Sequence, residues 1–185
     1  TDRQGSAPGT LAQITKGAFG MDMIDERREA ALWFRNLRDR IVEAFEALED
    51  EAGGAMAHGE TGGEPAAGPP APGRFEVTPT ERAGNGGGGI MSVMRGGRVF
   101  EKVGVNWSEV HGTLAPRAQA AMAARGVPGM DSDPRFWASG ISLVAHMQNP
   151  HVPAVHMNTR MFWTPNAWWF GGGADLNPCL EYPED

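Results

Sequence analysis

Residues 90–107, IMSVMRGGRVFEKVGVNW, give the clearest indication of the fold in this sequence. Two apolar runs, IMSVM and RVFEKVGVNW, lie on either side of Gly96-Gly97. A glycine pair between two such runs supplies the positive φ angles that a tight hairpin turn needs. The stretch therefore predicts a β-hairpin.

Three further strands are predicted downstream of this hairpin. They are residues 140–146 (GISLVAH), 154–163 (AVHMNTRMFW) and 167–172 (AWWFGG). The last two are separated by Thr164-Pro165-Asn166, a combination typical of a short turn. Because strand and helix patterns do not alternate as in βαβ units, we expect an α+β fold in which a broad antiparallel sheet within residues 85–185 is flanked by helices.

Two helices and a connector complete the predicted organisation, a single domain over residues 1–185. Between residues 25 and 50, large apolar side chains recur at steps of three and four, the spacing of one helix face. They are Phe34, Leu37, Ile41, Phe45 and Leu48. Residues 52–73 are rich in Gly, Pro and Ala and are expected to form a connector, whereas the alanine-rich residues 116–125 begin with a proline and predict a short helix.

The composition disfavours several classes of function. The net charge of −7 and the pI near 5.2 argue against nucleic acid and anionic membranes as partners, because both require basic surfaces. No apolar run is long enough for a transmembrane segment, and the polar start TDRQGSAPGT lacks the features of a signal peptide, so a cytoplasmic protein is expected. The single cysteine, Cys179, cannot form an internal disulfide.

The predicted strand 154–163 separates polar from apolar side chains. Because the side chains of a strand alternate between two faces, His156, Asn158 and Arg160 should share one face, opposite a largely apolar set that includes Thr159. A solvated sheet face usually carries Lys, Glu and Thr. An imidazole, an amide and a guanidinium in a row instead offer a proton carrier, an orienting group and a bidentate anion clamp, which slightly favours a functional site over a solvated face, otherwise an equally good interpretation.

Two neighbouring segments add candidates to this site. Ser142 and His146 should share a face of the preceding strand, and they lie near His156 only if the two strands pair, which the sequence leaves open. Asp175, in FGGGADLNP, follows a glycine run that permits close approach of a ligand, so its carboxylate is a candidate base or orienting group. A helix N-cap or an Asx turn is an equally good local interpretation of Asp175.

Three long blocks of the sequence resemble, in order and spacing, the signature blocks of oxygen-dependent coproporphyrinogen oxidases. The blocks are NGGGGIMSVMRGGRVFEKVGVNWSEVHG (85–112), FWASGISLVAHMQNPHVPAVHMNTRMF (136–162) and WWFGGGADLNP (168–178). The resemblance implies an enzyme of haem (porphyrin) biosynthesis. Its members use molecular oxygen to convert two propionates of coproporphyrinogen III to vinyl groups, which gives protoporphyrinogen IX.

The resemblance also assigns roles to single residues. The positions that contact substrate in the family correspond here to Ser142, Asn158, Thr159 and Arg160. His156 matches the proton donor, and Asp175 matches an aspartate that touches the pyrrole nitrogens at the macrocycle centre. His146 and His156 match candidate ligands for a divalent metal such as manganese. The family requires no flavin, haem or nicotinamide, and we expect no cofactor to be required here.

The implied reaction uses few protein groups. A base such as Asp175 helps to take a pyrrole proton, oxygen adds to the ring, and the peroxide removes a propionate β-hydrogen as carbon dioxide leaves. Hydrogen peroxide is the by-product. Because the protein is acidic, it needs a local cation such as Arg160 to hold a propionate by paired hydrogen bonds.

Members of the family continue beyond the EYPED-like sequence (181–185) with a histidine-bearing helix and a Gly-Gly-Arg substrate contact, and they form homodimers. We therefore expect this chain to be truncated at its C-terminus and its catalytic domain to be incomplete. Two alternatives remain open. One is a cupin-type metal-dependent oxygenase with His146, His151 and His156 on a β-barrel, although no carboxylate lies between these histidines. The other is a fragment that binds tetrapyrrole without turnover.

Overall fold

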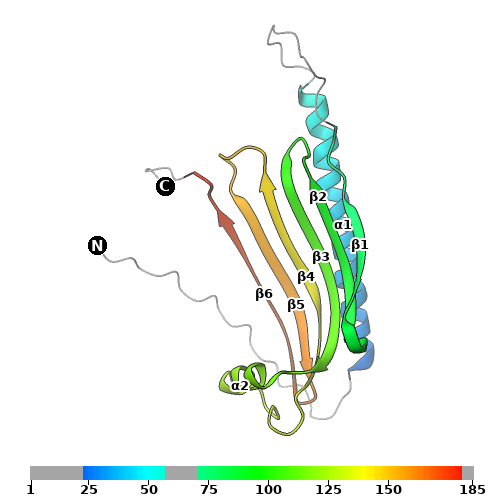
Figure 1. Cartoon of the computed structure of the whole chain (residues 1–185), viewed down its shortest axis with the longest axis vertical. Helices are drawn as coiled ribbons and strands as arrows, with labels where there is room; N and C mark the ends of the chain where they lie inside the picture. Colours follow the sequence, from blue (N-terminus) through cyan, green and yellow to red (C-terminus); the bar gives the residue numbers. More distant parts are fainter. Residues whose placement is uncertain (1–22, 57–70, 181–185) are drawn as a thin grey trace, which may run out of the picture.

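The computed structural model describes residues 23–56 and 71–180. Its centre is one antiparallel sheet in which every strand pairs with its neighbours in the chain, in the order β1-β2-β3-β4-β5-β6. The strands are β1 (Glu76–Glu81), β2 (Gly87–Arg95), β3 (Phe100–Thr113), β4 (Arg135–Met147), β5 (Ala154–Thr164) and β6 (Ala167–Asn177). Helix α1 (Ile24–Met56) runs along the sheet, and helix α2 (Pro116–Ala124) lies at one end (Figure 1). The predicted α+β class with an antiparallel sheet is confirmed.

The sheet begins earlier in the chain than the expected residue 85, because β1 adds an edge strand. All residues of β1 are exposed, so no alternation of buried and solvent-facing side chains marks this strand in the sequence. A short 3₁₀ helix (Ala83–Asn85) connects β1 to β2. Pro79 within β1 is tolerated because an edge strand needs ladder hydrogen bonds on one side only.

The face of the sheet that packs against α1, here called the helix face, is apolar. Its buried side chains come from alternate strand positions, as predicted, and include Val103, Val105, Ile141, Leu143 and Met161. Helix α1 covers them with Phe34, which is 1% exposed, and with Phe45, whose ring packs edge-on against Phe100 at a centroid distance of 4.9 Å. Burial of each large apolar side chain stabilises the fold by about 1.5 to 3 kcal/mol.

Helix α1 confirms the predicted helix at residues 25–50, but its apolar stripe ends differently from the prediction. Leu48 is 47% exposed, whereas Glu49 is completely buried. Residues four apart lie on the same side of a helix, so Glu49 continues the line of Phe45 toward the sheet. The stripe therefore ends on a carboxylate, not on a leucine.

Helix α1 also enters the segment 52–73, which is expected to be a connector. It ends at Met56, and residues 57–70 of the expected connector lie outside the described part of the chain. Alanine is the strongest helix former, and a helix that has already nucleated adds residues readily. For this reason EAGGAM (51–56) stays helical despite its two glycines.

The predicted hairpin forms between β2 and β3, with residues 96–99 as its turn. Gly96 has a φ of 60°, in the left-handed region that favours glycine. Gly97 is needed for another reason, because a Cβ atom on it would collide with the Glu49 carboxylate. The N–H of Gly97 donates to the carbonyl of Phe100 at 2.9 Å and closes the turn.

The Glu49 carboxylate fastens α1 to this turn. Four backbone N–H groups donate to its two oxygens: those of Gly73 (2.9 Å), Arg98 (2.5 Å), Val99 (2.9 Å) and Phe100 (3.0 Å). Burial alone would raise the pKa of Glu49, but the four donors favour the charged form and together hold the pKa below its ordinary value of 4.5. The buried carboxylate is therefore charged at neutral pH.

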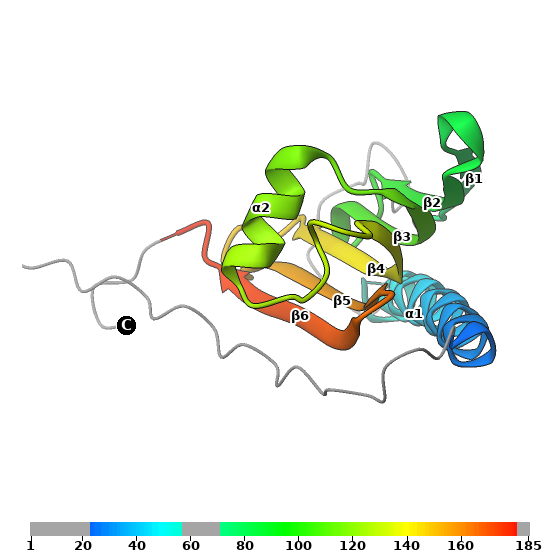
Figure 2. The same cartoon turned by 90° about the horizontal axis from the view of Figure 1, so that it is seen from below.

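The opposite face of the sheet, here called the polar face, is packed at one end by α2 and the residues that follow it (Figure 2). Val127 and Met130 are buried there against Ala167 of β6. The predicted helix at 116–125 is confirmed as α2, with its proline in the first turn. Beyond this end, most side chains of the polar face on β4, β5 and β6 are exposed or half-buried.

The sheet is open, with β1 and β6 as its edges among the described residues. The cupin alternative requires a β-barrel, so the observed architecture does not fit it.

Within the described residues, no helix has the length and apolar character needed to span a membrane.

Candidate active site

The register of the sheet brings polar residues of three strands together. Strands β4 and β5 pair directly, with Ser142 opposite Asn158, which is the pairing that the sequence leaves open. On the other side of β5, Asp175 of β6 lies opposite His156. Residues directly opposed across antiparallel strands project from the same face with Cβ atoms about 4.5–5.5 Å apart. These four side chains therefore form one cluster on the polar face.

His156 lies at the centre of a hydrogen-bond network. Its Nδ1 is 2.8 Å from Oδ1 of Asp175 and 2.9 Å from Nδ2 of Asn177, and this Asn177 amide donates to the same Asp175 oxygen at 3.0 Å. When Nδ1 carries a proton it donates to the carboxylate, and Nε2 remains available. The carboxylate then orients the ring, so His156 is placed to exchange a proton through Nε2.

Asp175 lies within β6 and in neither of the local alternatives, a helix N-cap or an Asx turn. Strand β6 extends past the predicted end at residue 172 to Asn177, because it pairs with β5 along its whole length. Glycines are poor strand formers, so the run from Gly171 to Gly173 conceals this continuation in the sequence.

Arg160 lies on the polar face two residues beyond Asn158, opposite Gly171 of β6. The residue is exposed, and no carboxylate in the described part of the chain forms an ion pair with it. In a protein with a net charge of −7, a guanidinium without a carboxylate partner is available to an anionic ligand.

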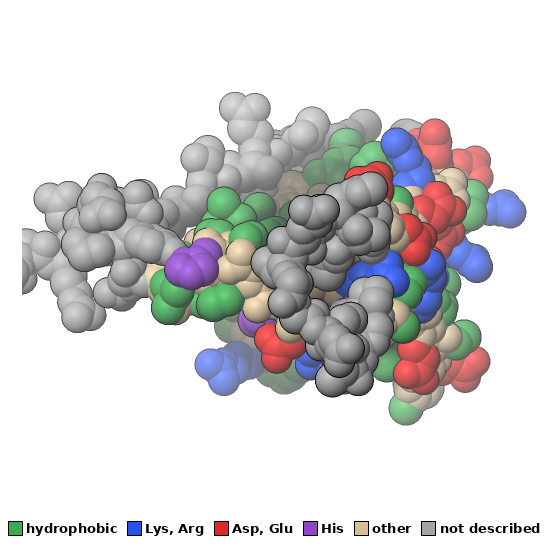
Figure 3. All heavy atoms as spheres, turned by 90° about the horizontal axis from the view of Figure 1, so that it is seen from above, with side chains coloured by type: hydrophobic (Ala, Val, Ile, Leu, Met, Phe, Trp, Pro, Cys, Tyr) green, Lys and Arg blue, Asp and Glu red, His purple; other side chains and the backbone are tan. Residues whose placement is uncertain are grey.

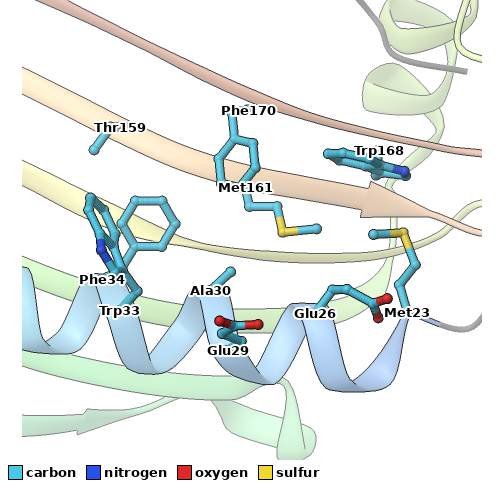
Figure 4. Close-up of a pocket in the computed structure, with 10 residues that line it drawn as sticks. All are labelled: Met23, Glu26, Glu29, Ala30, Trp33, Phe34, Thr159, Met161, Trp168 and Phe170. Carbon is cyan, nitrogen blue, oxygen red and sulfur yellow. The ribbon is translucent and has the colours of Figure 1, made fainter. Parts of the chain in front are cut away.

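Thr159 is not part of this cluster. It lies on the helix face and lines a hollow of about 730 Å³ between α1 and strands β5 and β6 (Figure 4). The remaining wall is mainly apolar, and its large side chains include Trp33, Phe34, Met161, Trp168 and Phe170. Thr159 and Arg160 are thus on opposite sides of the sheet, and the structure does not bring them to one ligand.

His146 projects from β4 near His156, with ring centroids 6.0 Å apart and ring planes at 78°. In the view along the long axis, histidine side chains reach the surface both apart from the charged side chains and beside acidic and basic ones (Figure 3). Within the residues described, no group of three or more His, Cys, Asp or Glu is arranged to hold a metal ion. Catalytic zinc sites use three protein ligands, so these two imidazoles do not by themselves fit a complete metal site.

Some residues of this face are not selected by sequence reasoning. Asn177 contacts His156, while Lys102 and Asn106 of β3 are the cross-strand partners of His146 and Ser142. Period-two alternation along EKVGVNW (101–107) places Lys102 and Asn106 on one face. The missing information is that β3 pairs with β4, which brings that face beside the histidines.

The comparisons with known proteins cover the same strands. A family model described as coproporphyrinogen III oxidase matches residues 29–185. Curated relatives named oxygen-dependent coproporphyrinogen-III oxidase include one from Rickettsia bellii, 45% identical over 159 residues, which are 86% of this chain and 49% of that protein. A relative of the same name from Rickettsia felis is 43% identical over 162 residues, 88% of this chain and 50% of that protein. The chain spans about half the length of these relatives. It belongs to the coproporphyrinogen III oxidase family.

Proposed function

We propose that the protein containing this chain catalyses the oxygen-dependent oxidative decarboxylation of coproporphyrinogen III to protoporphyrinogen IX in haem biosynthesis. The supporting observation is that the sheet of a family-matched chain places His156 and Asp175, 2.8 Å apart, on one face with Asn158 and the exposed Arg160. The relatives carry names that state this substrate and oxidant. The same assignment implies the fold of that family, a broad antiparallel sheet flanked by helices, and a cytoplasmic homodimer.

The reaction is balanced without a further oxidant. At each propionate, the bond to the carboxyl carbon breaks, one hydrogen leaves the β-carbon, and one oxygen molecule is reduced to hydrogen peroxide as carbon dioxide and the vinyl group form. Asp175 accepts a pyrrole proton while oxygen adds to the ring, and His156 returns a proton through Nε2. Because the substrate supplies the electrons, the protein contributes positioning and charge placement.

Replacing Arg160 by lysine should raise the activation free energy that corresponds to kcat/KM by about 2 to 3 kcal/mol. This lowers kcat/KM roughly 30- to 150-fold. Lysine keeps the charge but loses the planar fork that binds a carboxylate through two parallel hydrogen bonds. The measurement is the fluorescence of the oxidised porphyrin product, made by the full-length enzyme. Arg40→Lys, on the exposed surface of α1, is the matched control and should retain full activity. Wild-type kinetics in Arg160→Lys would show that Arg160 does not bind a propionate.

We further propose that turnover requires no bound metal or other cofactor, because His146 and His156 provide an incomplete ligand set. Treatment of the full-length enzyme with a strong chelator, followed by its removal, should leave the rate of porphyrin formation unchanged. If chelation abolishes activity and manganese or iron restores it, a metal completed by residues outside this chain takes part. His146→Ala then tests whether this site holds it.

The alternative, that this chain binds tetrapyrrole without turnover, is tested by measuring binding and turnover separately. Residues 1–185 alone and the full-length protein are compared for binding of coproporphyrin III and for turnover. Binding by both with turnover only in the longer protein would show that this chain supplies recognition while residues outside it complete catalysis.

A further inference from the structure

We infer that Gly104 of β3 and Gly173 of β6 are specificity-determining positions, where the rings of the substrate lie directly against the backbone of the polar face. This inference rests on the proposed function and extends it to the shape of the site. It predicts that the absence of a side chain at these two positions is required by the ligand and not by the protein fold.

The fold itself gives no reason for glycine at either position. A Cβ atom added to Gly173 would meet no described atom within 4 Å, and one added to Gly104 would meet only Nδ2 of Asn106, at 4.0 Å. Neither residue is among the described glycines with a positive φ. Alanine would therefore fit both positions without collision and without backbone strain.

Two other strand glycines of the same sheet differ in this respect. A Cβ atom on Gly140 would collide with the carbonyl oxygen of Thr159, and one on Gly172 would collide with the carbonyl oxygen of Asn158. These two glycines are required because neighbouring strands approach closely. Glycine within a strand costs backbone entropy and packs no side chain. Its presence at 104 and 173, where no such contact exists, therefore calls for a different cause.

Both positions border the candidate active site. Gly173 is the cross-strand partner of Asn158 and precedes Asp175 by two residues on the same face. Gly104 is the partner of Val144, which is in turn the partner of His156. Gly173 thus lies beside Asp175 along β6, and Gly104 lies two strands from His156 in the same row. From β3 to β6 there are three interstrand spacings, about 14 Å in all, a span that a tetrapyrrole bearing propionates can cover.

The chemistry of the surrounding groups fits a ring lying over bare backbone. The Asp175 carboxylate, held by His156 at 2.8 Å, projects from the same face of β6 as Gly173, so a ring whose pyrrole N–H donates to it extends over Gly173. A side chain at Gly173, on the same face of β6, would hold the ring away from the backbone. Gly104, the partner of Val144 on the side away from His156, likewise leaves the backbone of β3 open to the ring.

The experiment compares Gly173→Ala and Gly104→Ala with Thr78→Ala in the full-length protein, the last being on the exposed edge strand β1. We expect KM for coproporphyrinogen III to rise at least tenfold in each glycine variant, with a melting temperature equal to or above that of the wild type. Thr78→Ala should match the wild type. Binding of coproporphyrin III, followed by quenching of tryptophan fluorescence, should weaken in parallel. Gly172→Ala should instead lower the melting temperature, because its Cβ meets the neighbouring strand.

Three results would overturn the inference. Unchanged KM and binding in both glycine variants, in an enzyme whose wild type is active, would refute it and leave the proposed function intact. A lowered melting temperature with unchanged KM would show that the bare backbone makes room for protein. A wild-type protein that neither binds coproporphyrin III nor converts coproporphyrinogen III would refute the inference together with the proposed function.

Discussion

Replacing Glu49 by glutamine should lower the free energy of unfolding by about 3 to 5 kcal/mol, because it removes a buried charge from four backbone donors. The glutamine oxygen can still accept from two of these N–H groups. Its NH₂ group would face the other two, donor against donor, inside a fully buried site. The measurement is urea unfolding of the full-length protein. Glu43→Gln, at an exposed position of the same helix, should change stability by less than about 0.5 kcal/mol.

The contribution of Glu49 should also depend on pH. Because the folded-state pKa of Glu49 is below 4.5, the folded protein binds fewer protons than the unfolded chain near this pH. The stabilisation is fully present above pH 4.5 and is lost as the pH falls through the folded-state pKa. Wild type and Glu49→Gln should therefore converge in stability below pH 4.5. A difference that stays constant from pH 7 down to pH 3 would contradict the role of the charge.

Replacing His156 by alanine should lower kcat by about 10²- to 10⁴-fold, the usual value of a positioned general acid or base. The reason is the 2.8 Å contact between Nδ1 and Asp175, which leaves Nε2 to exchange a proton. Asp175→Asn keeps the size of the carboxylate partner but removes its charge, so it should also lower kcat. The measurement is porphyrin formation by the full-length enzyme.

His111→Ala provides the matched control for this substitution. His111 is an exposed histidine of β3, and its cross-strand partner Trp137 belongs to the buried side of the sheet, away from His156. Its loss should leave kcat within about twofold of the wild type, as expected of a surface substitution. A comparable loss in both histidine variants would indicate a general effect on the sheet. Full activity of His156→Ala would remove His156 from the proton-transfer step.

The parts of the fold that could be predicted are those with a local signal. The hairpin follows from Gly96-Gly97, and α1 follows from its three-and-four spacing. Strand β1 could not be predicted, because no side chain of it is buried and the strand is held by pairing with β2. Glu49 could not be distinguished from the other acids of α1, since its four donors come from residues 24 to 51 positions away in the chain.

Some residues of the candidate site could likewise be predicted from the sequence, and others could not. Alternation along β5 correctly places His156, Asn158 and Arg160 on one face, because a strand has a period of two whatever its partners. The resemblance alone suggests Thr159, which alternation already places on the other face, where it is found. The contact of Asn177 with His156 depends on the pairing of β5 with β6 beyond the glycines, and no local pattern encodes that register.

The unbroken chain order of the sheet has a consequence for how the protein is made. Hairpins form in about 1–10 μs, whereas a ribosome adds about 5–20 residues per second, so each strand can pair with its predecessor before the next one emerges. Helix α1, which is synthesised before the strands, must wait for β3 and β4 before its apolar side is covered. Assembly during synthesis would therefore follow the numbering of the strands. Among the strand contacts of this sheet, the one between His156 and Asp175 would form late, when β6 leaves the ribosome.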